Sequence, residues 1–220
     1  MLLKPILHDA VKEWGDKADV RIFLFETLSQ IHNARVLEVG CGKDYLLAAL
    51  PRSSQGYGID VDSKKLAQAR KNAPRAVFTN ASMYNIPFKK GHFDVVVCAN
   101  ALPGVDFPIA GSEGKRRKLR NKALSELNRV LKKEGTLLLT TPNGSYGKWP
   151  GKIKLEELSK LLKEAGFSAK IMGWNPFPPL LPPSRVLVKM PGWFSLLKHL
   201  TRNKIAMGKS KFFYVEARKL

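Results

Sequence analysis

The chain has 220 residues, which is enough for one sizeable core. Of these residues 44% are hydrophobic and 25% charged, the composition of a soluble globular protein rather than a disordered one. Its 38 lysines and arginines against 18 acidic residues give a formal net charge of +20, which predicts attraction to polyanions without choosing among nucleic acid, anionic lipid and acidic substrates. No apolar run approaches membrane-span length, and the start lacks signal-peptide organisation, so we expect a protein that is cytoplasmic or at most peripheral to a membrane. Two cysteines alone cannot hold a metal, so we also expect a metal-free protein.

Short apolar runs alternate with polar stretches of helical periodicity along most of the chain. Residues 1–33 carry apolar residues at helical spacing, which predicts one or two helices packed on the sheet edge or over its ligand end. In chain order, the elements expected after this helical lead-in are strand 36–39, helix 44–50, strand 56–61, helix 63–72, strand 76–79, strand 93–99, helix 115–133, strand 136–141, helix 155–165, strand 167–172 and strand 211–217.

This alternation predicts a single α/β domain over residues 1–220, with a three-layer, mainly parallel sheet. Residues 174–210 differ from the rest because they are rich in proline and aromatic residues and contain basic but no acidic side chains. We interpret them as a basic insertion before the last strand and not as a second domain.

The most informative stretch is Val36–Gly42, an apolar run that stops in the glycine turn Gly40-Cys41-Gly42. Such strand ends are where open α/β sheets bind ligands, and Asp60 ends the next strand near the roughly 20-residue spacing expected between a turn and a ribose-binding acid. The dinucleotide fingerprint G-x-G-x-x-G nevertheless fails, because no third glycine follows. Glu38, just before the turn, would also repel a diphosphate.

Glu38 with Gly40 and Gly42, followed by Asp60, resembles the cofactor site of class I S-adenosylmethionine-dependent methyltransferases. The resemblance runs in order from about residue 35 to 170, through Asn80-Ala81, Ile86-Pro87-Phe88, Phe93–Val97, Leu127–Lys132, Gly135 and Thr141-Pro142-Asn143. It implies a Rossmann-like methyltransferase fold, whose mostly parallel seven-stranded sheet has an antiparallel last strand. The overall look is nearest to small-molecule and lipid-quinone methyltransferases.

The resemblance implies S-adenosylmethionine as cofactor, held by residues at the strand ends: Glu38, Gly40, Cys41, Gly42, Asp60, Val61, Asn80, Ala81, Ser82, Ala99 and Asn100. In this assignment Glu38 faces the methionine amino group, and Asp60 holds the ribose hydroxyls. Val61 packs on the adenine face, Asn80 meets the adenine edge, and Asn100 lies under the methionine.

Several alternatives stay open at this point. The family commonly has glycine where this chain has Asp44, and aspartate where it has Asn80. The glycine turn could connect a strand to a helix without any ligand. Asp60 together with Asp62 could cap the following helix, and Asn100 could be only a turn residue.

The expected reaction is in-line attack of an acceptor atom on the sulfonium methyl group, with the protein supplying alignment and water exclusion. No residue stands out as a general base, so the catalytic residues stay unassigned; Cys98 is expected to be a core thiol and His92 a solvated turn residue. The turn Asn100-Ala101-Leu102-Pro103 lacks the N/D-P-P-Y/F pattern of nucleobase amino-group methylation. We therefore expect a small or lipid-like acceptor.

The basic surface leaves other partners open. Lys115–Lys118 can be a solvated helix face or a polyanion contact, and residues 193–200 can form an amphipathic helix at a lipid interface, a lid or ordinary core. The alternatives are therefore an RNA methyltransferase that uses the basic surface, contact with an anionic membrane, and a non-catalytic cofactor-binding partner protein.

Overall fold

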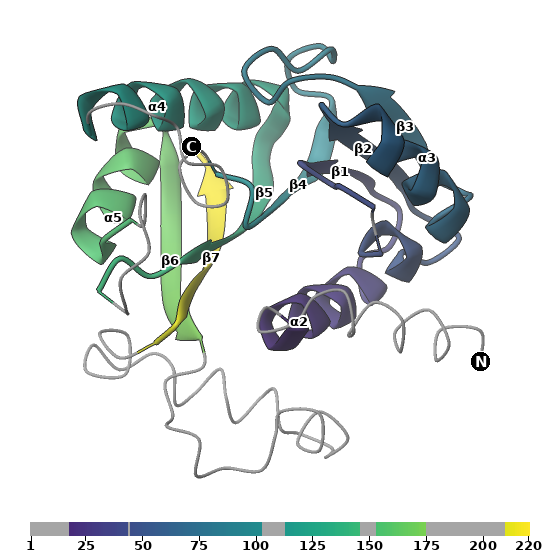
Figure 1. Ribbon diagram of the computed structural model, residues 1–220, viewed down its shortest axis with the longest axis horizontal. Coiled ribbons are helices and arrows are strands. Elements are labelled where there is room, and N and C mark those ends of the chain that lie inside the picture. The colour runs from purple at the N-terminus through teal and green to yellow at the C-terminus, as the bar shows by residue number, and fades with distance from the viewer. Residues whose placement is uncertain (1–17, 44, 103–112, 146–152, 175–209) are drawn as a thin grey trace, which may run out of the picture.

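The computed structural model describes residues 18–43, 45–102, 113–145, 153–174 and 210–220 (Figure 1). Seven strands form one sheet in the order β3-β2-β1-β4-β5-β7-β6. Their bounds are β1 Arg35–Val39, β2 Gln55–Asp60, β3 Val77–Asn80, β4 Phe93–Ala99, β5 Leu131–Pro142, β6 Phe167–Trp174 and β7 Phe212–Lys219. The β1–β5 neighbours pair in parallel, and β7 runs antiparallel to both β5 and β6. The predicted fold class, with its antiparallel last strand, is confirmed.

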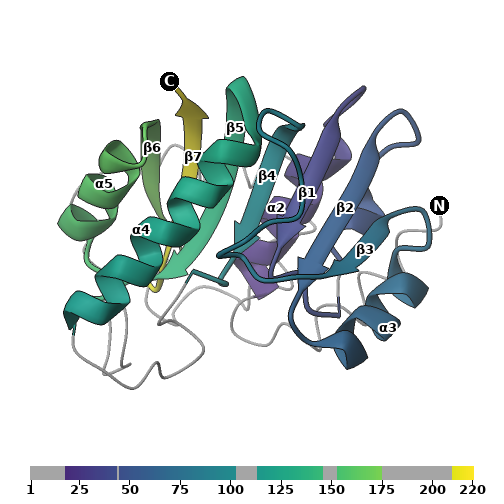
Figure 2. The same ribbon diagram turned by 90° about the horizontal axis from the view of Figure 1, so that it is seen from above.

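Helices cover both faces of this sheet, as the view from above shows (Figure 2). One apolar cluster joins the sheet to α2 (Ala18–Ser29), the short 3-10 helix η2 (Leu47–Ala49) and α3 (Ser63–Asn72). The other joins it to α4 (Glu113–Val130) and α5 (Leu155–Glu164). Burying both faces explains why the central strands read as continuous apolar runs in the sequence.

The helix predicted over residues 44–50 is wrong in length, because only Leu47–Ala49 is helical and residue 44 lies outside the described part. The segment between Gly42 and Pro51 is too short to offset the cost of starting an α-helix. Four of its side chains insert into the core instead: Leu46, Leu47, Ala49 and Leu50.

The predicted boundary between the helix 115–133 and the strand 136–141 is also wrong. Helix α4 already ends at Val130, and β5 starts at Leu131, which pairs with Phe93 before the register shifts at Val95. Glu134, with φ 61°, lies in this irregular start of the strand. The local periodicity could not show that pairing with β4 begins before the bulge.

The last strand enters the sheet between two earlier ones. Thr136–Pro142 of β5 pairs with β7 on one side, and Phe167–Trp174 of β6 pairs with it on the other. Most of the predicted lead-in 1–33 and insertion 174–210 lies outside the described residues, as do the segments 103–112 and 146–152. Of the helices described, none is both long and apolar enough to cross a bilayer.

Candidate cofactor site

The candidate site begins at the glycine turn that follows β1. Gly40 and Gly42 have φ of +71° and +59°, the left-handed region that favours glycine. The N–H groups of Gly40 and Cys41 both donate to the carbonyl of Ile59, at 2.8 and 3.1 Å. A Cβ atom on Gly40 would lie 2.5 Å from that of Ala101, so the turn after β1 is pressed against the segment after β4. Only glycine allows this close approach.

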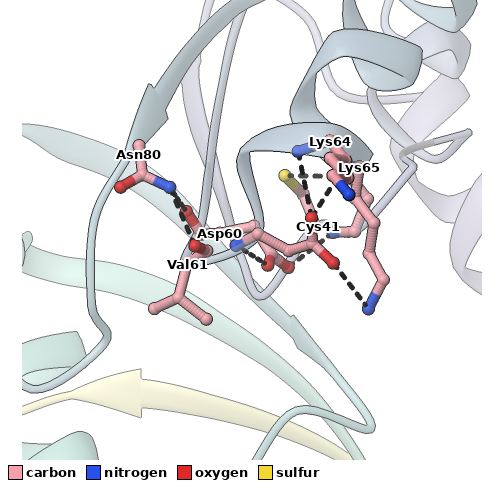
Figure 3. A network of polar contacts seen from close by, with 8 residues as sticks. Cys41, Asp60, Val61, Lys64, Lys65 and Asn80 are labelled. Atoms are coloured by element: carbon pink, nitrogen blue, oxygen red, sulfur yellow. Dashed lines mark hydrogen bonds and ion pairs between the residues drawn. The ribbon is translucent and has the colours of Figure 1, made fainter.

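Asp60 braces the turn from the end of β2 (Figure 3). Its Oδ2 accepts from the Gly42 N–H at 2.8 Å, and its Oδ1 accepts from the Asp62 N–H at 2.9 Å. A carboxylate has about four lone-pair sites, so both oxygens can accept further hydrogen bonds. The Asp60 side chain is therefore fixed in place and still able to bind a diol.

The helix cap is Asp62 and not Asp60. The Asp62 side chain accepts from the N–H groups of Lys64 at 3.0 Å and Lys65 at 3.1 Å, and it forms an ion pair with Lys65 at 3.6 Å. The Lys65 N–H bond in particular lowers the pKa of Asp62. Helix α3 thus has its own cap, which leaves Asp60 for another role.

The predicted adenine-side residues shape the loops beside Asp60. Val61 is 68% exposed, an unusual placement for an apolar side chain. The Asn80 Nδ2 donates to the carbonyls of Asp60 and Val61, at 3.2 and 2.9 Å, so that its Oδ1 points away from the loop in Figure 3. The Ala81 N–H donates to the Asp60 carbonyl at 3.1 Å, and the Ser82 hydroxyl accepts from the Tyr84 N–H at 3.2 Å.

An acidic side chain lies beneath the turn. Glu38 is only 1% exposed near the end of β1. Burial, with a smaller contribution from the Glu38 charge, raises the pKa of the neighbouring Cys98 thiol to about 12. Cys98 is therefore a protonated core thiol at neutral pH, as predicted. Cys41 also packs inward, because its Sγ would lie 3.0 Å from a Cβ on Gly58; its backbone alone belongs to the turn.

Asn100, one of the predicted site residues, combines an uncommon backbone conformation with a side chain that is unpaired within the described part of the chain. Its φ of 56° is uncommon outside glycine, and its N–H donates to the Thr140 carbonyl at 2.9 Å. The side chain is 3% exposed, yet neither its amide nitrogen nor its amide oxygen has a hydrogen-bond partner among the described residues. Leaving such a group unpaired costs about 1–3 kcal/mol, so an unpaired buried amide at a ligand-binding edge points to a missing partner.

Two neighbouring hydroxyls, on Thr140 and Thr141, share this property. Both side chains are fully buried at the carboxyl end of β5, without a hydrogen-bond partner in the described part of the chain. Sequence reasoning did not select them, although two polar residues ending an apolar run Leu137-Leu138-Leu139 are a usable signal. Nearby, the Arg21 Nη2 donates to the Ala99 carbonyl at 3.2 Å, which ties α2 to the same edge.

All the predicted site residues lie at the carboxyl ends of β1 to β4, which are neighbours in the sheet: Glu38, Gly40, Cys41, Gly42, Asp60, Val61, Asn80, Ala81, Ser82, Ala99 and Asn100. The arrangement fits S-adenosylmethionine: a buried acid by a close-packed turn suits a cationic amino acid, a braced carboxylate suits a ribose, and an exposed valine suits a base. The individual contacts stay predictions. No three potential metal-ligating side chains come together among the described residues.

Residues 37–139 match the family model described as "Methyltransferase domain". A phthiotriol/phenolphthiotriol dimycocerosates methyltransferase from Mycobacterium ulcerans is 30% identical over 139 residues, which are 60% of this chain and 47% of that protein. Its counterpart from Mycobacterium leprae is 28% identical over 66% of this chain and 53% of its own length. The chain thus spans about half the length of these curated relatives.

Among solved structures, an S-adenosylmethionine-dependent methyltransferase from Mesorhizobium loti has the same fold. The TM-score is 0.62, at 17% identity, and the match covers 93% of this chain and 99% of the other. At this identity the likeness concerns the fold alone.

Proposed function

We propose that the chain is a class I S-adenosylmethionine-dependent methyltransferase that transfers a methyl group from that cofactor to a lipid-like small-molecule acceptor. Two kinds of observation support the proposal. The curated relatives are named for methylation of phthiotriol and phenolphthiotriol dimycocerosates. The observation that carries it is the buried amide of Asn100 beside the glycine turn, which has no hydrogen-bond partner among the described residues and can bind a polar ligand at this edge.

S-adenosylmethionine supplies a methyl group on a positively charged sulfur. The chain therefore has to bind the cofactor and the acceptor, orient them and exclude water from between them. Glu38 offers a negative charge under the turn, which Gly40 allows to pack closely against Ala101. Asp60 accepts from ribose hydroxyls with the lone pairs that the turn does not use. Val61 loses its exposed apolar surface beneath the base.

On the acceptor side, the ends of β4 and β5 present Asn100, Thr140 and Thr141. The unpaired amide of Asn100 can hydrogen-bond a hydroxyl or similar polar group on an otherwise apolar acceptor and orient it; one of the two threonine hydroxyls can assist, since consecutive side chains of β5 face opposite sides of the sheet. Cys98 does not serve as a base, since its thiol is buried and its pKa is raised to about 12. The chain's contribution at this edge is therefore positioning.

Two measurements test the proposal in sequence. Isothermal titration calorimetry with S-adenosylmethionine and S-adenosylhomocysteine should show one saturable site, whereas NAD should not bind. Radiolabelled methyl transfer is then assayed on a total lipid extract and, in parallel, on total RNA. Label in the lipid fraction supports the proposed acceptor. Label confined to RNA would overturn the acceptor class, and binding without any transfer would favour a cofactor-binding partner protein.

A further inference from the structure

A second group of charged residues lies at the amino ends of the parallel strands, opposite the candidate cofactor site. They surround residues 88–92 of the loop that joins β3 to β4. Two hydrogen bonds dock this loop on the end of α4: the Gly91 N–H donates to the Arg129 carbonyl at 3.0 Å, and the His92 N–H donates to that of Val130 at 2.8 Å. A Cβ on Gly91 would meet no atom within 4 Å. The loop is thus held on α4 by its backbone, and its opposite side, at Gly91, has no atoms of the described residues close to it.

Cations from four segments gather around this loop. Lys89 and Lys90 are exposed on the loop itself. Arg35 begins β1 and places its Nη1 3.4 Å from the His92 Nδ1. Lys132 lies near the start of β5, and Lys219 ends the antiparallel β7, which brings it to the same edge. We call these five side chains, together with His92, the basic rim.

The acidic groups that face the basic rim are already engaged. Asp94 forms an ion pair with Lys132 and accepts from the Arg35 N–H at 2.9 Å. Glu126 is held by Arg129, at 2.6 Å between Oε1 and Nε. The two loop lysines have no acidic partner among the described residues, and their backbone N–H groups have no acceptor there either.

Part of the basic rim has a structural explanation. The Lys219 Nζ donates to the carbonyls of Asn128 and Leu131, both at 2.7 Å, and so satisfies the negative end of α4. Lys132 neutralises Asp94. Neither reason applies to Lys89 and Lys90, which add two charges where the positive potential is already high.

The pKa values of two side chains, His92 and Lys219, respond to this excess charge. Burial lowers the pKa of His92, and the positive charges of Arg35, Lys89 and Lys132 lower it further against the opposing effect of Asp94. Burial likewise lowers the pKa of Lys219, and the charge of Lys90 adds to it. A bound anion would counteract the contribution of the neighbouring positive charges to both shifts.

We propose that the basic rim binds a small phosphorylated molecule through its phosphoryl group, with Lys89 and Lys90 as the principal contacts and His92 at the floor. Phosphate suits a compact set of cations and free backbone N–H groups on one short loop. A membrane surface fits less well, because the glycine turn and Asn100 lie at the other end of the strands. Five-residue β1 alone separates the two edges by about 15 Å. A lipid acceptor would then have to enter from the side away from the membrane.

The His92 ring serves as the reporter. It stacks on Phe88, with ring centroids 5.8 Å apart, and meets Phe93 edge-on at 4.8 Å, so its NMR signals can be identified by through-space contacts to these rings. Its pKa is measured in chloride and in inorganic phosphate at constant ionic strength, then with glycerol 3-phosphate and glycerol. Because a bound dianion favours the imidazolium form, saturating phosphate should raise the pKa of His92 by at least about half a unit.

The variant K89A/K90A should weaken phosphate binding at least tenfold. The control K71A/K160A removes two exposed lysines from α3 and α5, and it should bind like the parent. An unchanged pKa of His92 in phosphate, or equal losses in both variants, would overturn the proposal. Binding of RNA or of phosphatidylserine vesicles that K89A/K90A abolishes, without any effect of phosphate or glycerol 3-phosphate, would also overturn it and assign the basic rim to a macromolecular surface. None of these readouts depends on methyl transfer.

Discussion

Replacing Asp60 by alanine tests the assignment of the cofactor site most directly. The Asp60 carboxylate makes two backbone hydrogen bonds in the structure, at 2.8 Å to Gly42 and 2.9 Å to Asp62. The proposed role adds two ribose hydroxyls. A hydrogen bond to a charged group contributes about 1.5–3 kcal/mol, so losing two of them weakens binding by about 3 kcal/mol at the lower figure. That loss is roughly 100-fold in Kd.

Asp62→Ala is the matched control. It removes a carboxylate two residues away that also accepts two backbone N–H groups, those of Lys64 and Lys65. Loss of such a cap lowers the free energy of unfolding, and removing the half-buried turn brace in D60A lowers it by a comparable amount. The two variants should therefore be equally destabilised, while only D60A loses the cofactor.

Calorimetry with S-adenosylmethionine gives the Kd, and urea denaturation of each variant without ligand gives the stability. The result expected is a Kd near the parent's for D62A and a Kd about 100-fold weaker for D60A. A D60A protein that binds as tightly as the parent would remove Asp60 from the ribose role. Equal losses in both variants would show that the carboxylates act only through the turn.

Three further outcomes are expected. Gly40→Ala combines a left-handed backbone with a Cβ 2.5 Å from that of Ala101, so urea denaturation should show a loss of roughly 3 kcal/mol and calorimetry no cofactor binding. Cys98 should resist iodoacetamide in the native protein at pH 8 and react only after unfolding, because burial raises the pKa of its thiol to about 12; peptide mapping reads this out. Arg129 lowers the pKa of Glu126, so the stability that this pair contributes is present above the pKa of Glu126 in the unfolded chain and is lost as pH falls through its pKa in the folded protein. Thermal unfolding should therefore show that E126Q loses less stability than the parent between pH 5 and pH 3.

Each outcome has a clear contrary result. A Gly40→Ala protein as stable as the parent would mean that the turn can move away from Ala101. Rapid native alkylation of Cys98 would mean that the strand end opens to solvent. If E126Q and the parent lose the same stability between pH 5 and pH 3, the pKa of Glu126 is not lowered in the folded protein.

Sequence reasoning succeeded where local pattern and topology coincide. Glycines after β1 and an acid after β2 lie together because the carboxyl ends of parallel neighbours share one edge, so Gly40 and Asp60 could be brought together from the sequence. The hydrogen bond from the Gly42 N–H to the Asp60 carboxylate could not be predicted in this way. The Asn80 side chain likewise has its amide nitrogen turned to two carbonyls, a detail that depends on how the loop closes.

Contacts between distant segments were the main omission. His92 was predicted to be a solvated turn residue, but it is half-buried against the rings of Tyr57, Phe88 and Phe93. Tyr57 is 35 residues away in the chain and comes close only because β2 and β4 both flank β1. Thr140 was passed over because its burial without a partner depends on the same kind of distant packing.

The position of β7 has a consequence for how the chain is made. Strand β7 lies between β5 and β6, although it follows both in the sequence, so the two earlier strands have no native neighbour on their facing edges until residues 212–219 have left the ribosome. Until then the apolar edge of Leu137, Leu138 and Leu139 is open to pairing with other chains. Completion of the sheet thus has to wait for β7, and a chaperone that shields β5 would act during that interval.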